Sequence, residues 1–505
     1  MLAAVRSACV TGSTGQPIVV EVHVGVGLPG FSIVGLPDAA CRESHDRVRA
    51  AILSSGHSWP AHRITVNLAP GSLRKNGVGL DLPLAVGILV ADGVIPAARI
   101  EGLGFVGELG LDGSVRAVTG AVPLVAALGD VDPVVARRDV PSARIATTRT
   151  VHAVATLGEL LTVLRDDEPW PPLPLVDWLE EPLPPPDLSD VRGQPHARRA
   201  LEIAAAGHHH VLLVGPPGAG KTMLAKRLTG LLPPLTHAQS FETTVIHSAA
   251  GVTLPAGGVI RFPPFRSPHQ TSSTVAMVGG GSSYIRPGEV SLANNGVLFL
   301  DEMAEFSPVV LDGLRQPLEE GVVRISRARE AVTIPANVTL VAATNPCPCG
   351  EARPGGCTCR QTAKERYLRR LSGPLLDRFD LRVTVARPTT ETLLSLAGGE
   401  STEQVRARVT IARERMLQRG YGLNGELEVA MLDDVAPLRD AARELLRSEL
   451  ERGRLSGRGL HRIRRVARTI ADLEGDFEMV EVGHVAAALS QIGRASCRER
   501  VCVPV

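Results

Sequence analysis

A glycine-rich stretch with the spacing G-x-x-x-x-G-K-T offers the clearest chemistry in the sequence. Its members are Gly215, Pro216, Pro217, Gly218, Ala219, Gly220, Lys221 and Thr222. Glycines at these positions let backbone N–H groups turn inward around an anion, and a helix that starts at the loop adds the positive end of its dipole. The pattern predicts a phosphate-binding loop, in which Lys221 reaches the β- and γ-phosphates of ATP and Thr222 binds Mg²⁺.

Two further polar sites follow apolar runs downstream of this loop. Residues 296–300 form a run that ends in Asp301 and Glu302, and residues 337–344 form another that ends at Asn345. We expect Asp301 to hold Mg²⁺ through water and Glu302 to polarise the attacking water. Asn345 would place an amide beside the γ-phosphate, the role called sensor 1. The alternative for the two carboxylates is a surface acidic pair.

An arginine later in the chain could complete the site from another subunit. Arg378 lies in the segment L-S-G-P-L-L-D-R-F-D of residues 371–380. Hydrolysis spreads negative charge over the γ-phosphoryl oxygens, and an arginine finger from a neighbouring copy stabilises that charge. The alternative is a surface ion pair with Asp377 or Asp380.

Four of the eight cysteines lie close together in the sequence, as two C-x-C pairs. They are Cys347, Cys349, Cys357 and Cys359. Four thiolates can fill the tetrahedral shell of a structural Zn²⁺ ion. The spacing is tighter than that of the usual C-x-x-C ribbon, and free thiols or a redox pair are the alternatives. A reducing cytoplasm favours zinc.

The elements around these residues predict how they are positioned. Residues 211–214 are a short apolar run typical of a buried parallel strand, and residues 223–232 have helical spacing. A strand, a glycine loop and a helix in this order are the context that a phosphate loop requires, and a chance glycine-rich turn would lack it. The sequence therefore predicts an α/β core with a parallel sheet.

The composition limits the class of protein. The chain has 505 residues, 44% hydrophobic and 21% charged, which suits a globular protein of about three domains. The formal net charge is only +1, so any contact with nucleic acid must come from local patches. We find no apolar run of about 18 residues and no signal-peptide pattern, and we expect a cytoplasmic protein without a membrane partner.

The pattern along the chain predicts five segments. They are an α/β unit at residues 1–165, a proline-rich linker at 166–187, the ATPase core at 188–388, a helical lid at 389–491 and a tail at 492–505. Helices are expected at residues 38–55 and 81–91 in the first unit, and at 402–418, 433–452 and 459–473 in the lid. The tail resembles a translated sequencing adapter, and we expect it to be no native part of the fold.

The first unit resembles the proteolytic domain of Lon-type proteases. The resemblance lies in K-N-G-V-G-L-D-L-P-L-A at residues 75–85 and G-E-L-G-L-D-G at residues 107–113. In those proteases a serine stands where this chain has Gly79, and a lysine stands near Val122. Because a Ser-Lys mechanism needs both a hydroxyl and an amine, we predict a proteolytically inactive domain that serves as a structural or interaction module.

The core and lid resemble the magnesium-chelatase-like branch of AAA+ ATPases. The residues that carry the likeness are the phosphate loop, Asp301-Glu302, Asn345, Arg378 and the run S-G-R-G-L-H-R at 456–462. Arg458 matches the sensor 2 arginine of that branch, which touches the γ-phosphate. With the Lon-like unit in front, residues 1–491 resemble the YifB/ComM family. The resemblance implies a homo-oligomer in a hexameric ring, and a DNA helicase that drives branch migration during natural transformation.

Basic residues in a predicted hairpin fit such a machine. Arg324, Arg327 and Arg329 alternate with apolar residues in the segment 322–330. In a ring they could meet the phosphate backbone of DNA without reading its sequence, because no aromatic residue stands beside them for base stacking. The alternative is a solvated hairpin edge whose charges prevent aggregation.

Three functions remain open on the sequence. The first is a ring-forming DNA motor, the second is a magnesium-chelatase-type motor subunit, and the third is an AAA+ factor that remodels protein. The Lon-like unit favours the first over the second. Stimulation of ATP hydrolysis by DNA would separate the first from the third.

Overall fold

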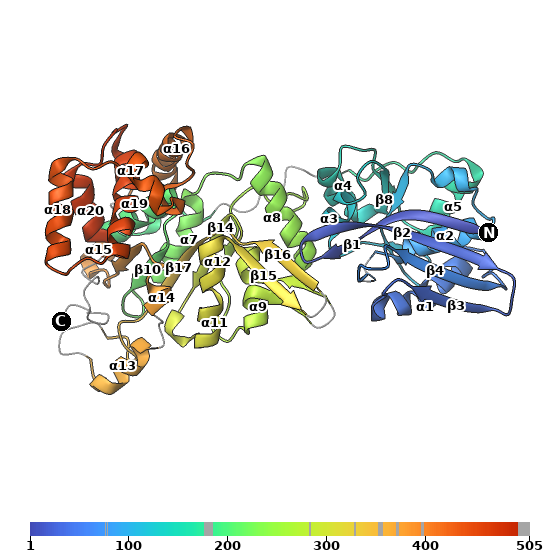
Figure 1. Ribbon diagram of the computed structural model, residues 1–505, viewed down its shortest axis with the longest axis horizontal. Helices are drawn as coiled ribbons and strands as arrows, with labels where there is room; N and C mark the ends of the chain where they lie inside the picture. Colours follow the sequence, from blue (N-terminus) through green and yellow to red (C-terminus); the bar gives the residue numbers. More distant parts are fainter. Residues whose placement is uncertain are drawn as a thin grey trace.

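The computed structural model describes residues 1–492, apart from 76, 78, 176–184, 282–283, 328–329, 352–356, 370–372 and 395–397. Three units follow one another along the longest axis of the molecule in chain order, from the blue N-terminal unit to the orange and red helices (Figure 1). Among the described residues, none of the helices combines the length and the apolar character that a bilayer crossing needs.

The N-terminal unit is built on one mixed sheet of seven strands, in the order β3-β4-β2-β1-β5-β8-β9. The strands are β1 (Leu2–Thr11), β2 (Thr14–Gly25), β3 (Gly30–Val34), β4 (Arg63–Ala69), β5 (Leu103–Phe105), β8 (Asp132–Ala136) and β9 (His152–Val154). The short strands β6 (Glu108–Leu109) and β7 (Val115–Arg116) pair with each other outside this sheet.

Five α-helices belong to this unit. They are α1 (Ala39–Ser54), α2 (Asp81–Ala91), α3 (Ala121–Ala126), α4 (Val140–Ala146) and α5 (Leu157–Asp166). Every residue of α2 is buried, and the helix packs on β1 and β2. The predicted helices at 38–55 and 81–91 are confirmed, and the side chain of Asp38 caps α1 by accepting from the N–H of Cys41 at 2.8 Å.

The middle unit contains a five-stranded sheet in the order β11-β14-β17-β10-β18, in which all neighbours are parallel. Its strands are β10 (Val211–Val214), β11 (Phe265–Arg266), β14 (Gly296–Leu300), β17 (Val338–Thr344) and β18 (Leu381–Thr384). Because neighbouring strands are parallel, the residues that follow β10, β14 and β17 come out at one edge of the sheet. The predicted parallel α/β core is confirmed.

Helices and small hairpins surround this sheet. The helices are α6 (Pro195–Gly207), α7 (Lys221–Leu231), α8 (His237–Ala250), α9 (Thr274–Val278), α10 (Glu289–Leu292), α11 (Pro308–Gly313), α12 (Arg315–Glu320), α13 (Gln361–Arg369) and α14 (Gly373–Leu376). Strands β12 (Gly279–Gly280) and β13 (Arg286–Pro287) form one antiparallel pair, and β15 (Val322–Arg327) and β16 (Glu330–Pro335) form the predicted hairpin.

The C-terminal unit is helical. Its helices are α15 (Thr390–Leu394), α16 (Thr402–Gln418), α17 (Leu432–Val435), α18 (Asp440–Glu451), α19 (Gly457–Glu474) and α20 (Val482–Ile492). Helix α16 has the predicted bounds and starts with a capping box of Ser401 and Gln404. The prediction of one helix over 433–452 is wrong. The chain leaves the helix at Ala436, because the residue before Pro437 is sterically excluded from the α region.

The proline-rich segment contacts the units on both sides. The ring of Trp170 stacks on His152 of β9, with ring centroids 4.0 Å apart and planes at 22°. At the other end, the carboxylate of Asp187 accepts from the N–H of Thr402 at the start of α16. The carbonyl of Asp187 accepts from Arg227 of α7 at 2.7 Å. The segment thus ties lid and core together.

Candidate nucleotide-binding site

The glycine-rich loop connects β10 to α7, as predicted. Gly218 and Gly220 adopt φ angles of +77° and +91°, in the left-handed region that favours glycine. A side chain at Gly215 would clash, since an added Cβ would meet the carbonyl oxygen of Val385, the residue after β18. Glycine is therefore required both for the turn and for the close approach of the neighbouring strand.

Lys221 is folded back over the loop. Its Nζ donates to the carbonyl oxygens of Gly215 at 2.7 Å and Pro216 at 3.0 Å, and to Oδ1 of Asn345 at 3.1 Å. Burial lowers the pKa of Lys221, while the nearby carboxylates of Asp301 and Glu302 act in the opposite direction. An ammonium group held at the centre of the loop can exchange these neutral acceptors for phosphate oxygens.

The two candidate Mg²⁺ residues meet across the sheet edge. Oγ1 of Thr222 donates to Oδ2 of Asp301 at 2.8 Å, although one residue lies on α7 and the other follows β14. Glu302 adopts φ +49°, and its N–H donates to Oδ1 of Asp301 at 3.0 Å. A hydroxyl and a carboxylate at this distance are suitable oxygen ligands for Mg²⁺. The structure thus brings together Lys221, Thr222, Asp301, Glu302 and Asn345.

Two further residues lie at the same edge: Arg387, which the sequence reasoning missed, and Gln194, whose segment 190–194 stands just upstream of the phosphate loop and suits a contact on the adenine side. The guanidinium of Arg387 donates to the carbonyl of Pro217 in the loop at 3.2 Å. The side chain of Gln194, at the start of α6, donates to the carbonyl of Ala386. The only signals in the sequence are their positions. Gln194 stands directly before a helix, and Arg387 follows a strand next to the loop. Both residues lie beside the loop, where a base or ribose could be held.

The predicted arginines Arg378 and Arg458 lie at the opposite edge of the sheet. Arg378 precedes β18, and the N–H groups of Asp380 and Leu381 donate to the carbonyl of His210, which precedes β10. Strand β10 has four residues and so spans about 13 Å between this edge and the glycine loop. Arg378 and Arg458 are therefore not brought to this chain's own phosphate loop.

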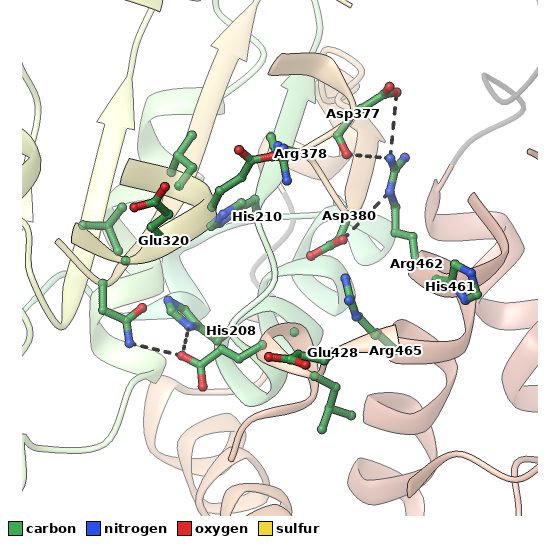
Figure 2. Close-up of a pocket in the computed structure, with 18 of the residues that line it drawn as sticks. His208, His210, Glu320, Asp377, Arg378, Asp380, Glu428, His461, Arg462 and Arg465 are labelled. Atoms are coloured by element: carbon green, nitrogen blue, oxygen red, sulfur yellow. Dashed lines mark hydrogen bonds and ion pairs between the residues drawn. The ribbon is translucent and has the colours of Figure 1, made fainter. Parts of the chain in front are cut away.

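Both arginines line one cavity of about 800 Å³ between core and lid. Figure 2 shows Arg378 there beside Asp377 and Asp380. Arg378 pairs with Glu319 of α12, and Arg458 of α19 lies 3.7 Å from a carboxylate oxygen of Asp377. Burial lowers the pKa of Arg378, and the positive charges of Arg458 and Arg315 lower it further. Four arginines and six acidic residues line this cavity, so the arginines lie among carboxylates that pair with them.

A polar network around the same cavity joins lid and core. Arg462 donates to the carbonyl of Asp377 at 2.6 Å and lies 3.9 Å from a carboxylate oxygen of Asp380 (Figure 2). His209 contacts Asp380 at 3.1 Å through one ring nitrogen and Thr469 of α19 at 2.8 Å through the other. His208 bonds Glu426 of the lid at 2.8 Å. The run of three histidines is the signal in the sequence, although its spacing by itself indicates only an ordinary loop.

The four cysteines form a compact cluster after Asn345. Their Sγ atoms all lie within 4.8 Å of one another, and none of the four is in a disulfide. Cys347 is buried, Cys349 is exposed, and the other two are half-buried. This geometry could hold a metal ion.

The basic hairpin extends from the middle unit toward the N-terminal unit (Figure 1). Arg324 pairs with Glu320 at 2.7 Å and its side chain is 57% exposed, so it can exchange this partner for another anion. Arg327 is half-buried at the end of β15, and Arg329 lies outside the described residues. The turn between β1 and β2 reaches the hairpin, since a Cβ at Gly12 would meet Val332.

Comparisons with known proteins agree over the whole length. Three family models match: "Subunit ChlI of Mg-chelatase" at residues 20–132, "Magnesium chelatase, subunit ChlI" at 187–393, and "Magnesium chelatase, subunit ChlI C-terminal" at 399–491. An uncharacterized protein of Mycobacterium tuberculosis is 47% identical over 492 residues, covering 96% of this chain and 97% of its own. Lon protease 2 of Bacillus subtilis is 30% identical over 163 residues. The match covers 30% of this chain and 28% of that protease.

The sheet order, the glycine loop and the matching family models define a magnesium-chelatase-like AAA+ protein. Competence protein ComM of Haemophilus influenzae is 41% identical over 508 residues, with 97% of each chain covered. YifB of Escherichia coli is 40% identical over 500 residues, with 97% of this chain and 96% of YifB covered. The chain belongs to the YifB/ComM family.

Proposed function

We propose that the protein hydrolyses ATP with Mg²⁺ and uses the energy as a motor. Lys221 would bind the β- and γ-phosphates, Thr222 and Asp301 would hold Mg²⁺, Glu302 would activate the water, and Asn345 would sense the γ-phosphate. The observation that carries the proposal is the convergence of these five residues on one sheet edge, where Thr222 bonds Asp301 at 2.8 Å and Lys221 bonds Asn345 at 3.1 Å. This set matches what phosphoryl transfer needs, which is positioning and charge stabilisation.

We propose that copies of the chain form a ring in which each nucleotide lies between two subunits. Support comes from Arg378 and Arg458, which share a cavity on the edge that faces away from their own glycine loop. A head-to-tail arrangement would bring this edge of one copy to the glycine loop of the next. Both arginines would then act on the neighbour's γ-phosphate. A ring of six is the arrangement that the family resemblance implies.

We propose DNA as the track of this motor, in the role of a branch-migration helicase. The exposed Arg324 and the half-buried Arg327, at the end of the same strand, would contact phosphates in the channel of the ring. Such contacts bind any sequence and weaken as salt rises. The test is the rate of ATP hydrolysis with and without forked DNA at two salt concentrations. Strong stimulation that falls with salt supports the proposal, and an unchanged rate contradicts it.

Two other functions have support of their own. All three matching family models carry the name of a magnesium chelatase subunit, including the one over residues 20–132, so the N-terminal unit does not by itself exclude that activity. However, the relatives matched over nearly their whole length include ComM and YifB. An AAA+ factor acting on protein would respond to a protein partner and not to DNA, so the same assay separates it.

We propose that the N-terminal unit, residues 1–165 of the predicted division, does not cleave peptides. Gly79 has a φ angle of +82°, a Cβ added there would lie 3.2 Å from Val106 and 3.5 Å from Leu124, and Val122 is fully buried. Neither position offers a nucleophile or a base, and a serine at Gly79 would be strained. Incubation with unfolded casein and ATP should leave the substrate intact.

The cofactors of this proposal are ATP and Mg²⁺. A zinc ion at the four cysteines would take no part in hydrolysis, because four thiolates fill the tetrahedral shell and leave no position open for water.

A further inference from the structure

The distances within the cysteine cluster fit a single metal ion. Sγ of Cys347 lies 3.3 Å from that of Cys349 and 3.6 Å from that of Cys357, and Cys349 and Cys357 are 3.7 Å apart. A tetrahedral Zn²⁺ with Zn–S bonds of about 2.3 Å places its ligands about 3.8 Å from one another. Disulfide sulfurs would be only about 2.0 Å apart, so the cluster matches a tetrathiolate site better than two disulfides.

The cluster is also separated from the other described cysteines. Cys9 and Cys41 lie in the core of the N-terminal unit, far along the chain. The four clustered thiols come from two short segments on either side of residues 352–356. They meet at the surface of the core unit, where Cys347 is buried and Cys349 is exposed. Two short segments that carry two donors each are the usual construction of a structural zinc site.

The segment that carries the cluster lies directly on the glycine loop. Gly350 has a φ angle of +74°, and its N–H donates to the carbonyl of Cys347 at 2.9 Å. A Cβ added at Gly350 would come within 2.6 Å of Cδ of Pro217 and 3.9 Å of Cγ of Asn345. The turn between the first two cysteines and the rest of the cluster therefore touches both the loop and the sensor residue.

We propose that Cys347, Cys349, Cys357 and Cys359 bind one Zn²⁺ ion that holds this turn against the glycine loop and fixes Asn345 for nucleotide binding. Zn²⁺ replaces the four thiol protons, which pass to solvent, and the site becomes a tetrathiolate. Cys347 stands two residues after Asn345, so an ion bound there restrains the end of β17. The cysteines act as positioning residues, and the coupling to the nucleotide rests on the proposed function.

Two measurements on the full-length chain test the two parts of the proposal separately. Zinc content is measured by elemental analysis after purification under reducing conditions, and nucleotide affinity is measured with a fluorescent, non-hydrolysable ATP analogue and Mg²⁺. We expect about one zinc ion per chain, and none in the variant that combines C357S and C359S. That variant should bind the analogue about tenfold more weakly, because the wall of the site is no longer fixed.

Two further variants separate the metal from the nucleotide. Lys221→Ala should keep its zinc while losing analogue binding, so failure of the nucleotide assignment would leave the metal result intact. Gly350→Ala should keep its zinc and weaken analogue binding, since the added Cβ pushes on Pro217. Because the cysteine variant could fail to fold, zinc is also removed from wild-type protein with a chelator and added back, and the affinity should fall and recover.

Two results would overturn the proposal. Wild-type protein without zinc, even after incubation with Zn²⁺ under reducing conditions, contradicts the metal site. Zinc-free protein that binds the analogue with unchanged affinity contradicts the coupling, whatever the metal content of the wild type.

Discussion

Thr222 and Asp301 are joined by a hydrogen bond of 2.8 Å between Oγ1 and Oδ2. They belong to different elements, α7 and the end of β14, with β17 between β14 and β10 in the sheet. The bond shows that both oxygens reach the same point above the sheet edge. One Mg²⁺ ion at this point would take the place of this hydrogen bond and be held by both oxygens. Glu302 follows immediately, so the proposed water-activating group and the proposed metal site are set by one strand end.

The Glu302→Gln variant should bind ATP and hydrolyse it very slowly. Glutamine keeps the size of the side chain but cannot take a proton from water, and loss of a general base costs about 10²–10⁴ in rate. Steady-state phosphate release and analogue binding measure the two effects. Glu444→Gln, on the exposed face of α18, is the matched control and should behave as wild type. Hydrolysis by the Glu302 variant at the wild-type rate would remove Glu302 from the mechanism.

Replacing Arg324 and Arg327 together by alanine should reduce the stimulation by DNA while leaving the rate without DNA unchanged. Each arginine that no longer meets a phosphate makes DNA affinity less dependent on salt, by about one unit in the slope of log K against log salt. Affinity for forked DNA at several salt concentrations measures this slope. Arg443→Ala, an equally exposed arginine on α18, is the control. An unchanged slope in the double variant means that the hairpin does not touch DNA.

Stability should fall as pH drops from about 6.5 to 4, partly because of His210. Burial lowers its pKa from 6.5 to about 4, and Nδ1 accepts from the N–H of Leu340, so the folded protein keeps the ring neutral. In this window the unfolded chain binds a proton that the folded chain does not, which costs up to about 1.4 kcal/mol per pH unit. Above the pKa of this histidine in the unfolded chain, the ring is neutral in both states, and His210 adds no dependence of stability on pH.

His210→Asn should make the decline with pH shallower, because asparagine keeps an acceptor but does not titrate. The measurement is the free energy of urea unfolding at several pH values between 7 and 4. His62→Asn, at an exposed position in the N-terminal unit, should leave the slope unchanged. If the His210 variant has the slope of the wild type, the ring is not held neutral in the folded protein.

Local signals predicted much of the fold. The bounds of α2 and α16 match the expectation, because helical spacing runs through each segment without a break. The same reasoning failed at residues 433–452, where the spacing continues across Pro437 although the backbone cannot remain helical. Spacing alone does not register such a break.

The nucleotide edge could be predicted because its residues directly follow strands, and parallel strands bring such positions together. The placement of Arg458 beside Arg378 could not. It depends on how the lid packs on the core through His208, His209 and Glu426, contacts between segments far apart in the chain. The contact of Gly350 with Pro217 is equally nonlocal, and only the structure connects the cysteines with the glycine loop.

The central claim is that one copy supplies the glycine loop and Glu302 while the next supplies Arg378. The most direct test mixes two variants that are each nearly inactive, Glu302→Gln and Arg378→Ala, under conditions where subunits exchange. The Arg378 variant keeps Glu302, and the Glu302 variant keeps Arg378. A site is therefore complete when the Arg378 variant holds the nucleotide and the Glu302 variant is its neighbour, which is true of about a quarter of the sites in an equal mixture. We predict a rise in ATP hydrolysis to about a quarter of the wild-type rate. A mixture as inactive as its components, with subunit exchange demonstrated, would contradict the account.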